Sequence, residues 1–281
     1  MERIGVIGLG RMGSAIASRM QDQGYNVLGW TRSGANLAGI TSAPNLAALV
    51  ANSDVLILSL FDDTAVASVL DALLDSDLTG KQIIETSTVV PAVLKDRIAS
   101  IEAKGAVAVD APISGGPELV HAGACGVFIG GTEAAAKRAS AVLAGISSRV
   151  FHVGPLGTGL VMKTINNAML QCYFNGLGEL MPLAKRSGLP METAMRILAG
   201  GPAGMPFIVD RLPKILGEDD TAGFTINAGK KDNGVFQGVV QSYGLASETL
   251  KASGTRLELA INAGLGEADP AALVRFAYDA G

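Results

Sequence analysis

The chain has 281 residues, of which 48% are hydrophobic and 17% are charged, and its formal net charge is −4. This length allows two domains with a sizeable core. No cluster of lysine and arginine stands out, which argues against a nucleic-acid partner. The longest apolar runs are short and interrupted by glycine or aspartate, so the sequence predicts no membrane span.

Cysteine and histidine are rare in this chain. The two cysteines, Cys125 and Cys172, lie far apart, which favours reduced thiols and a cytoplasmic protein. His121 and His152 have no cysteine or carboxylate neighbours at ligand spacing, so we expect no metal site. Met1 leads directly into a strand-like run, so we also expect no signal peptide.

The first half of the chain alternates strand-like and helix-like runs. The predicted strands are residues 4–8, 26–30, 55–59, 82–85, 107–110, 127–130 and 150–153. The predicted helices between them are residues 14–20, 45–51, 65–74, 92–104 and 133–143, with Pro44 and Pro91 near two helix starts. This alternation predicts an α/β domain with a doubly wound, mostly parallel sheet.

The pattern changes after the glycine-rich stretch 154–159. Helical periodicity then covers residues 160–187, 191–198, 206–216, 227–243, 246–264 and 270–280. Asp269 is predicted to cap the last helix, with Pro270 at its first position. We therefore predict a Rossmann domain over residues 1–158 and an all-helical domain over residues 159–281.

The first predicted strand runs into the turn Gly8-Leu9-Gly10-Arg11-Met12-Gly13, and a predicted helix follows. Gly8 allows the tight turn, Gly10 lets the backbone approach a pyrophosphate, and Gly13 lets helix and strand pack closely. The pyrophosphate is expected on the free N–H groups at the start of that helix. This placement favours dinucleotide binding over a glycine-rich turn without a ligand.

The second predicted strand ends in Thr31-Arg32-Ser33, without the acidic residue that usually binds the ribose of NAD(H). The two hydroxyls can donate to a 2′-phosphate, and Arg32 can form a charge-assisted fork with it. NADP(H) is therefore favoured, while NAD(H) remains possible. In the alternative reading, Arg32 is only a solvated loop cation.

Lys163 and Asn167 are four residues apart and share one helical face near the start of the second predicted domain. Such a pair can give one ammonium to a reacting oxygen and one amide to orient it. By spacing alone, a solvated lysine and a surface asparagine remain an alternative. At pH 7 a lysine is mostly the ammonium ion, because its ordinary pKa is about 10.4.

The chain resembles the β-hydroxyacid dehydrogenase family, which includes 3-hydroxyisobutyrate dehydrogenase and glyoxylate/succinic semialdehyde reductases. The resemblance covers nearly the whole chain and rests on four motifs in the family's order. They are the glycine-rich turn at 8–13, Asp110-Ala111-Pro112-Ile113-Ser114-Gly115-Gly116, the segment 157–167, and Phe224 with Lys231-Asp232. It implies an oxidoreductase that moves a hydride between a nicotinamide cofactor and a small hydroxy acid or its semialdehyde.

The resemblance also assigns roles to individual residues. It makes Lys163 the proton donor in reduction, with Asn167 beside it. Ser114, Gly115 and Gly116 would hold the substrate carboxylate through a hydroxyl and backbone N–H groups. The cofactor would be contacted by the whole turn at 8–13 and by Leu60, Phe61, Thr88, Phe224 and Lys231. For Leu60 and Phe61, ordinary packing at a strand end is an equal alternative.

Two departures from the family pattern bear on the substrate. Leu119 and Val120, within Pro117-Glu118-Leu119-Val120, replace a glycine–alanine pair, which affects the geometry of the carboxylate site. The helical part is too short for a 6-phosphogluconate dehydrogenase. Two alternatives remain. One is an imine reductase of the same architecture, which Lys163 disfavours, and the other is a cofactor-binding module without activity.

The predicted helix at 160–187 carries apolar residues on more than one face. A helix of this kind usually runs through a core or a subunit interface. We therefore expect a homodimer or a homotetramer, with contacts through the helical domains.

Overall fold

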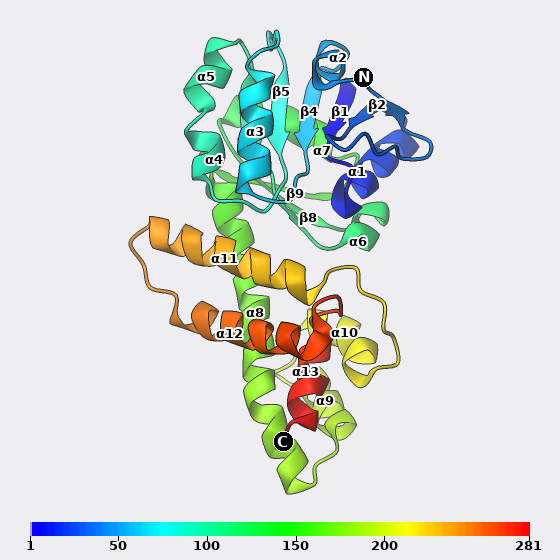
Figure 1. Ribbon diagram of the computed structural model, residues 1–281, viewed down its shortest axis with the longest axis vertical. Helices are drawn as coiled ribbons and strands as arrows, with labels where there is room; N and C mark the ends of the chain where they lie inside the picture. Colours follow the sequence, from blue (N-terminus) through cyan, green and yellow to red (C-terminus); the bar gives the residue numbers. More distant parts are fainter. Residues whose placement is uncertain (1) are drawn as a thin grey trace. The chain divides into compact units, whose positions relative to one another are not determined.

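The computed structural model describes residues 2–281 of the chain. The chain divides into two compact units, one ending at Asn166 and the other formed by Asn167–Gly281 (Figure 1). The division lies within the long helix α8 (Thr158–Ser187), later than the expected boundary before residue 159. The first turns of α8 are hydrogen-bonded to residues 110–114 of the first unit, which explains the difference.

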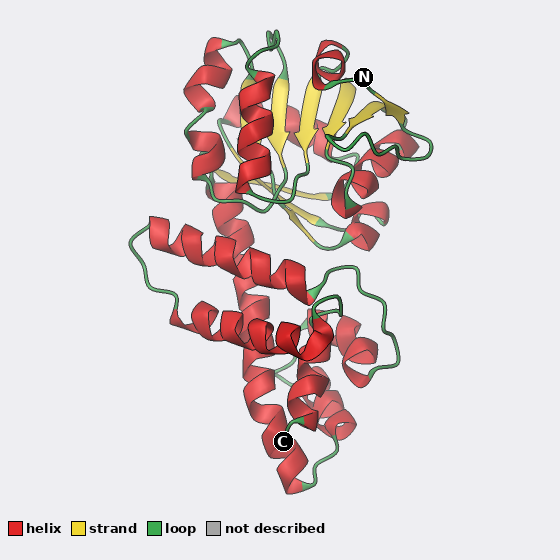
Figure 2. Cartoon of the chain, in the orientation of Figure 1, coloured by secondary structure: helices red, strands yellow, loops and turns green. Residues whose placement is uncertain are grey.

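Nine strands of the described residues form one sheet, in the order β3-β2-β1-β4-β5-β6-β8-β7, with β9 paired to β8 (Figure 2). The strands from β3 to β6 are parallel, whereas β8 is antiparallel to β6 and β7. This arrangement confirms the predicted mostly parallel sheet. The bounds are β1 (Arg3–Ile7), β2 (Asn26–Trp30), β3 (Thr41–Ser42), β4 (Val55–Leu58), β5 (Gln82–Glu85), β6 (Val107–Asp110), β7 (Ile113–Ser114), β8 (Gly126–Gly130) and β9 (Arg149–Gly154).

Strand order reverses at β1, because β2 lies on one side of it and β4 on the other. In open α/β sheets, ligands bind beyond the carboxyl ends of the strands at such a switch point. The turn after β1 therefore lies where a ligand is expected.

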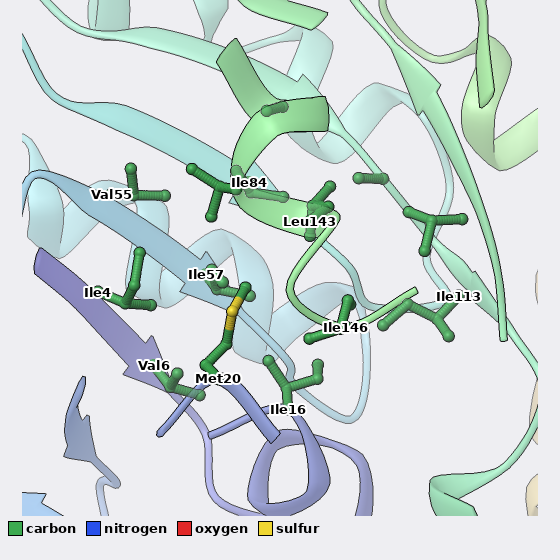
Figure 3. Close-up of a cluster of buried hydrophobic side chains, with 14 of the residues drawn as sticks. Ile4, Val6, Ile16, Met20, Val55, Ile57, Ile84, Ile113, Leu143 and Ile146 are labelled. Carbon is green, nitrogen blue, oxygen red and sulfur yellow. The ribbon is translucent and has the colours of Figure 1, made fainter. Parts of the chain in front are cut away.

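The central strands are buried on both faces, and alternate residues contribute to two separate cores. Ile4, Val6, Val55 and Ile57 pack with Ile16 and Met20 of α1 on one face (Figure 3). Ile7, Leu56 and Leu58 pack with Leu70 of α3 on the other face. The period of two in a strand produces this division. It also explains why these strands are continuous apolar runs.

The helices of the first unit are mostly those predicted. Side chains cap three of them: Asn45 accepts from Ala48 N, Asp62 from Ala65 N and Thr132 from Ala135 N. The predicted helix at 92–104 is divided in two, and one short helix, α6, was not predicted. The bounds are α1 (Arg11–Asp22), α2 (Leu46–Ala51), α3 (Asp63–Leu73), α4 (Ala92–Lys95), α5 (Ile98–Ala103), α6 (Pro117–His121) and α7 (Glu133–Leu143).

The second unit, as described, is helical, in agreement with the expected fold class. Its core includes Phe174, Met195, Ile208 and Val274. Among residues 2–281, no helix is long and apolar enough to cross a bilayer. After α8 its helices are α9 (Met191–Gly200), α10 (Pro206–Leu216), α11 (Ile226–Ser242), α12 (Glu248–Ala260) and α13 (Ala272–Asp279), and the segment η1 (Ile261–Leu265) after α12 is kinked at Gly264.

The predicted start of the last helix was wrong by two residues, because α13 begins at Ala272. Asp269 nevertheless accepts hydrogen bonds from the backbone at this end of the helix. Its carboxylate accepts from Ala271 N at 3.0 Å, and its carbonyl accepts from Ala272 N at 2.9 Å. The carboxylate also pairs with Arg211 at 3.1 Å. Pro270 thus lies in the turn that precedes the helix.

Candidate active site

The turn after β1 has the backbone geometry of a dinucleotide-binding loop. Gly8 has a φ of 96°, and a Cβ there would overlap the carbonyl oxygen of Ser59. A Cβ on Gly13 would overlap the carbonyl oxygen of Gly8, so helix and strand can pack this closely only with glycine. A Cβ on Gly10, in contrast, would meet nothing within 4 Å.

The open space at Gly10 fits a pyrophosphate. Gly10 is the N-cap of α1, and among the described residues no side chain caps this helix end. The first N–H groups of a helix lack intrahelical partners, and the dipole makes this end attractive to anions. A side chain at Gly10 would occupy the space where an anion can reach these donors. The residues present therefore fit the expected cofactor.

The end of β2 lies directly beside this turn. Gly8 N donates to the carbonyl of Trp30 at 2.9 Å, which brings the residues after Trp30 next to the glycine-rich loop. The hydroxyls of Thr31 and Ser33 are 3.3 Å apart, and Arg32 is exposed. Two hydroxyls and one guanidinium are thus available at this end of the strand.

The ends of β4 and β5 are joined by a serine. Ser87 Oγ accepts from Leu60 N at 2.8 Å, and Ser87 N donates to Glu85 Oε1 at 2.5 Å. Phe61, next to Leu60, is 69% exposed, and Thr88 is half-buried. Ser87 therefore fixes the two segments that carry the predicted cofactor contacts Leu60, Phe61 and Thr88.

Lys163 lies against the predicted substrate segment. Its Nζ donates to the carbonyl of Ile113 at 2.6 Å, and the residue is only 6% exposed. One turn further along α8, Asn166 Nδ2 donates to Ser114 Oγ at 2.9 Å. The structure thus brings Lys163 and Ser114 together, although they are far apart in sequence.

Asn166, to which sequence reasoning gave no role, is the asparagine that contacts Ser114. Asn167, its half-buried neighbour, is the one that the family resemblance selects. The spacing from Lys163 would have singled out either residue, because both i,i+3 and i,i+4 partners share a helical face. Only the fold of residues 113–114 distinguishes them.

Asp110, at the end of β6, was named only as the start of a motif, yet it holds the start of α8. Its Oδ1 accepts from Gly157 N at 2.6 Å and its Oδ2 accepts from Leu160 N at 2.8 Å. Burial raises the pKa of Asp110 to about 6, although these two hydrogen bonds and the charge of Lys95 oppose the rise. An acid at the end of a buried strand, followed much later by a glycine-rich helix start, is the signal that could have revealed this contact.

In the segment after Ser114, the side chain of Leu119 lies close to the backbone of Gly115. Gly115 has a φ of 125°, and a Cβ there would lie 2.8 Å from Leu119 Cδ1. Leu119 belongs to α6, which starts directly after Gly116. Leu119 is therefore a close neighbour of Gly115, one of the expected carboxylate contacts.

In the second unit, Phe224 precedes α11, whose start is capped by Thr225 Oγ1 accepting from Ala228 N at 3.2 Å. Lys231, on the second turn of α11, lies 3.2 Å from the buried carboxylate of Asp232. The next residue, Asn233, donates to Gln171 Oε1 on α8 and to the carbonyl of Leu250. These buried bonds fix the rotation of α11, and with it the position of Lys231 within this unit.

Comparisons with known proteins identify the family. Residues 3–154 match the family described as the NAD binding domain of 6-phosphogluconate dehydrogenase. Residues 157–277 match the family described as NAD-binding of NADP-dependent 3-hydroxyisobutyrate dehydrogenase. Together, the fold, the glycine-rich turn and these matches define a nicotinamide-dinucleotide oxidoreductase.

Similar proteins narrow the class further. The chain is 30% identical over 243 residues to 2-(hydroxymethyl)glutarate dehydrogenase of Eubacterium barkeri, covering 83% of this chain and 80% of that protein. It is also 30% identical over 254 residues to the mitochondrial 3-hydroxyisobutyrate dehydrogenase of Drosophila melanogaster, covering 86% and 78%. The chain belongs to the β-hydroxyacid dehydrogenase family and is an NAD(P)-dependent hydroxyacid dehydrogenase.

A solved structure shares the fold. Mycobacterium tuberculosis 3-hydroxyisobutyrate dehydrogenase with L-serine superposes with a TM-score of 0.88. The match covers 98% of this chain and 99% of that chain, at 24% identity. This agreement confirms the predicted order of a Rossmann sheet followed by helices.

Proposed function

We propose that this protein interconverts a small hydroxy acid and its semialdehyde with NADP(H) as the favoured cofactor, and that Lys163 is the proton donor and acceptor. The observation that carries the proposal is the position of Lys163: its side chain is buried, and its Nζ lies 2.6 Å from the Ile113 carbonyl oxygen, next to Ser114. A lysine amine beside the predicted carboxylate-binding segment can pass a proton to and from the oxygen of a substrate bound there.

The nicotinamide, when bound, supplies or accepts the hydride. In reduction, Lys163 Nζ donates a proton to the oxygen of the carbonyl that becomes the alcohol. In oxidation, the neutral amine takes that proton back. A positioned acid or base of this kind contributes about 10²–10⁴-fold to a rate.

The remaining roles follow the chemistry of each side chain. Ser114, Gly115 and Gly116 hold the substrate carboxylate, and Asn167 orients the reacting oxygen. Thr31, Arg32 and Ser33 bind the 2′-phosphate, for which a guanidinium beside two hydroxyls is well suited. The other cofactor contacts are Leu9, Arg11 and Met12 of the turn, together with Leu60, Phe61, Thr88, Phe224 and Lys231.

A rate screen tests this function directly. NADPH and NADH are each offered with glyoxylate, succinic semialdehyde, tartronate semialdehyde and methylmalonate semialdehyde, and the Lys163→Ala protein serves as the matched control. We expect turnover of at least one carboxylate-bearing aldehyde, faster with NADPH and largely lost in the control. A cyclic imine is offered in the same screen, and its turnover without turnover of any of these aldehydes would instead identify an imine reductase.

We also propose that the protein works as a homo-oligomer through α8. Ile165, Met169, Leu180 and Leu183 are 55–65% exposed, and they recur on one face of this helix. Gly176 lies between them, and a Cβ there would meet nothing within 4 Å. A continuous apolar stripe of this length is typical of an interface between subunits.

Light scattering at micromolar concentration tests the oligomer. The wild type should have the mass of a dimer or tetramer, and Leu180→Glu should shift it towards the monomer because it places a charge within the stripe. Lys137→Glu, on the exposed face of α7, is the control that should keep the wild-type mass. A monomeric wild type would refute the proposal.

A further inference from the structure

Residues 110–114 contact α8 at three positions, one helical turn apart. Asp110 Oδ2 accepts from Leu160 N, the Ile113 carbonyl accepts from Lys163 Nζ, and Ser114 Oγ accepts from Asn166 Nδ2. The three helix positions are each separated by three residues, so they form one row on the surface of α8. A five-residue segment thus runs beside the helix and is hydrogen-bonded to each of its first three turns.

Asp110 is the strongest of the three contacts, because one carboxylate binds two N–H groups at the helix start. The distances are 2.6 Å to Gly157 N and 2.8 Å to Leu160 N, and Asp110 is 1% exposed. Two bonds from one planar group restrict both the rotation of the helix and its movement along its axis. Charge-assisted bonds of this kind are about twice as strong as neutral ones.

Two glycines lie close against this carboxylate. A Cβ on Gly130 would overlap Asp110 Oδ1, and a Cβ on Gly159 would lie 2.8 Å from Oδ2. Gly157, with a φ of 93°, carries one of the two donors in a conformation that favours glycine. Gly130 of β8 and Gly159 at the start of α8 therefore allow the helix to approach Asp110 closely.

We propose that Asp110 is a positioning residue, which sets where Lys163 stands by fixing the first turn of α8 against residues 110–114. This inference rests on the proposed function of Lys163. It goes further by assigning the placement of the proton donor to an acid that contacts neither substrate nor cofactor. Lys163 lies one turn after Leu160, so a shift of the helix start moves its Nζ directly. A misplacement of 1 Å can cost about 100-fold in rate.

Two substitutions test the inference in the full-length protein. Asp110→Ala removes both acceptors and should lower kcat about 10–100-fold, whereas Asp110→Asn keeps one acceptor and should be intermediate. The Kd for NADPH should change less than about twofold in both, because the glycine-rich turn lies on other strands. Thr132→Ala is the matched control: it removes the cap of α7 in the same unit and should lower the melting temperature without lowering kcat.

Amide hydrogen exchange in the apo protein provides a readout that needs no activity. Peptides covering residues 157–166 should exchange faster in Asp110→Ala than in the wild type, while those covering α7 should not change. A loss of stability without a positioning role would accelerate exchange in both regions. Uniform acceleration would therefore overturn the inference.

A double-mutant cycle then separates this inference from the proposed function. If Asp110 acts through Lys163, adding Asp110→Ala to Lys163→Ala should lower kcat by less than about twofold, because the effects of residues that act as a unit do not add. If the kcat losses of the two single variants multiply in the double variant, only the positioning role is overturned. The same holds if the Asp110→Ala protein is fully active while the Lys163→Ala protein is inactive. A Lys163→Ala protein with wild-type kcat would instead overturn the proposed function itself.

Discussion

The glycine-rich turn and the Lys163 region are built in opposite ways. The turn depends on backbone conformation and on the absence of side chains. Gly8 and Gly13 permit close backbone contacts that any Cβ would prevent, and Gly10 leaves space for the expected pyrophosphate. The Lys163 region uses side chains that reach a segment about 50 residues away in the chain, as in the bonds from Lys163 to the Ile113 carbonyl and from Asn166 to Ser114. The first site is therefore contained in one short motif, and the second exists only once β7 and α8 are in place.

This difference determines how each region should respond to change. A backbone site tolerates many side chains but not an added methyl group at the wrong glycine. A side-chain site loses its chemistry when a single group is removed, while its surroundings remain folded. Substitutions in the two regions should consequently affect different measurements.

The largest effect is expected at Lys163. Lys163→Ala should lower kcat about 10²–10⁴-fold, because it removes the proposed proton donor, while the Kd for NADPH should barely change. Lys163→Arg should not restore the rate, since a guanidinium keeps the charge but does not release its proton. Steady-state kinetics and fluorescence titration of NADPH measure the two quantities. Normal turnover by a Lys163→Ala protein that binds NADPH would place the proton donor elsewhere.

The glycines of the turn should separate folding from binding. Gly10→Ala should leave the melting temperature of the apo protein unchanged or slightly higher, because its φ of −70° suits alanine and the space is open. Its Kd for NADPH should rise at least about tenfold, since the methyl group would occupy the pyrophosphate space. Gly13→Ala should instead destabilise the apo protein by about 1–3 kcal/mol, through overlap with the Gly8 carbonyl. If Gly10→Ala and Gly13→Ala changed the stability and the Kd for NADPH equally, the assignment of Gly10 to binding and Gly13 to folding would be contradicted.

Much of the fold was predictable because its signals are local. The longer strands are apolar runs in a parallel sheet, and the longer helices have clear periodicity. The two-residue strands β3 and β7 and the five-residue helix α6 are too short to show either pattern. They form because their neighbours hold them, as β8 holds Ile113 and Ser114.

The candidate site was predictable only in part, for the same reason. The resemblance selected Lys163, Ser114 and Asn167, but nothing local indicated that Asn166 would contact Ser114 or that Asp110 would hold α8. These bonds join residues about 50 positions apart. Such contacts depend on which strand lies beside which helix, and residue spacing along the chain does not encode that.

Arg32 provides a smaller and more selective test of the backbone site. Arg32→Ala should weaken the binding of NADPH by about 1.5–3 kcal/mol, the cost of losing a charge-assisted contact. The binding of NADH should be nearly unchanged. The KM values for both cofactors, measured with the same substrate, give the comparison. Thr41→Ala, on the exposed strand β3, is a control that should change neither KM. Equal losses for the two cofactors would show that Arg32 does not recognise the 2′-phosphate.

The smallest expected effect on the rate is a pH dependence at Asp110, which faces Lys95 and pairs in strand register with Glu85. Its pKa of about 6 exceeds the ordinary 3.8, so the folded state binds more protons than the unfolded state between these values. The contribution of Asp110 to the free energy of unfolding should therefore fall by about 2 kcal/mol as pH rises from 4 to 6. Protonation removes one of the two acceptors, so kcat should decline severalfold below pH 6 while this contribution to stability increases. Asp110→Asn, which resembles the protonated form, should lack both changes.

The difference between wild type and Asp110→Asn, in kcat and in chemical denaturation at each pH, isolates the group from other carboxylates. A decline in kcat below pH 6 that persists in Asp110→Asn would assign it to another residue.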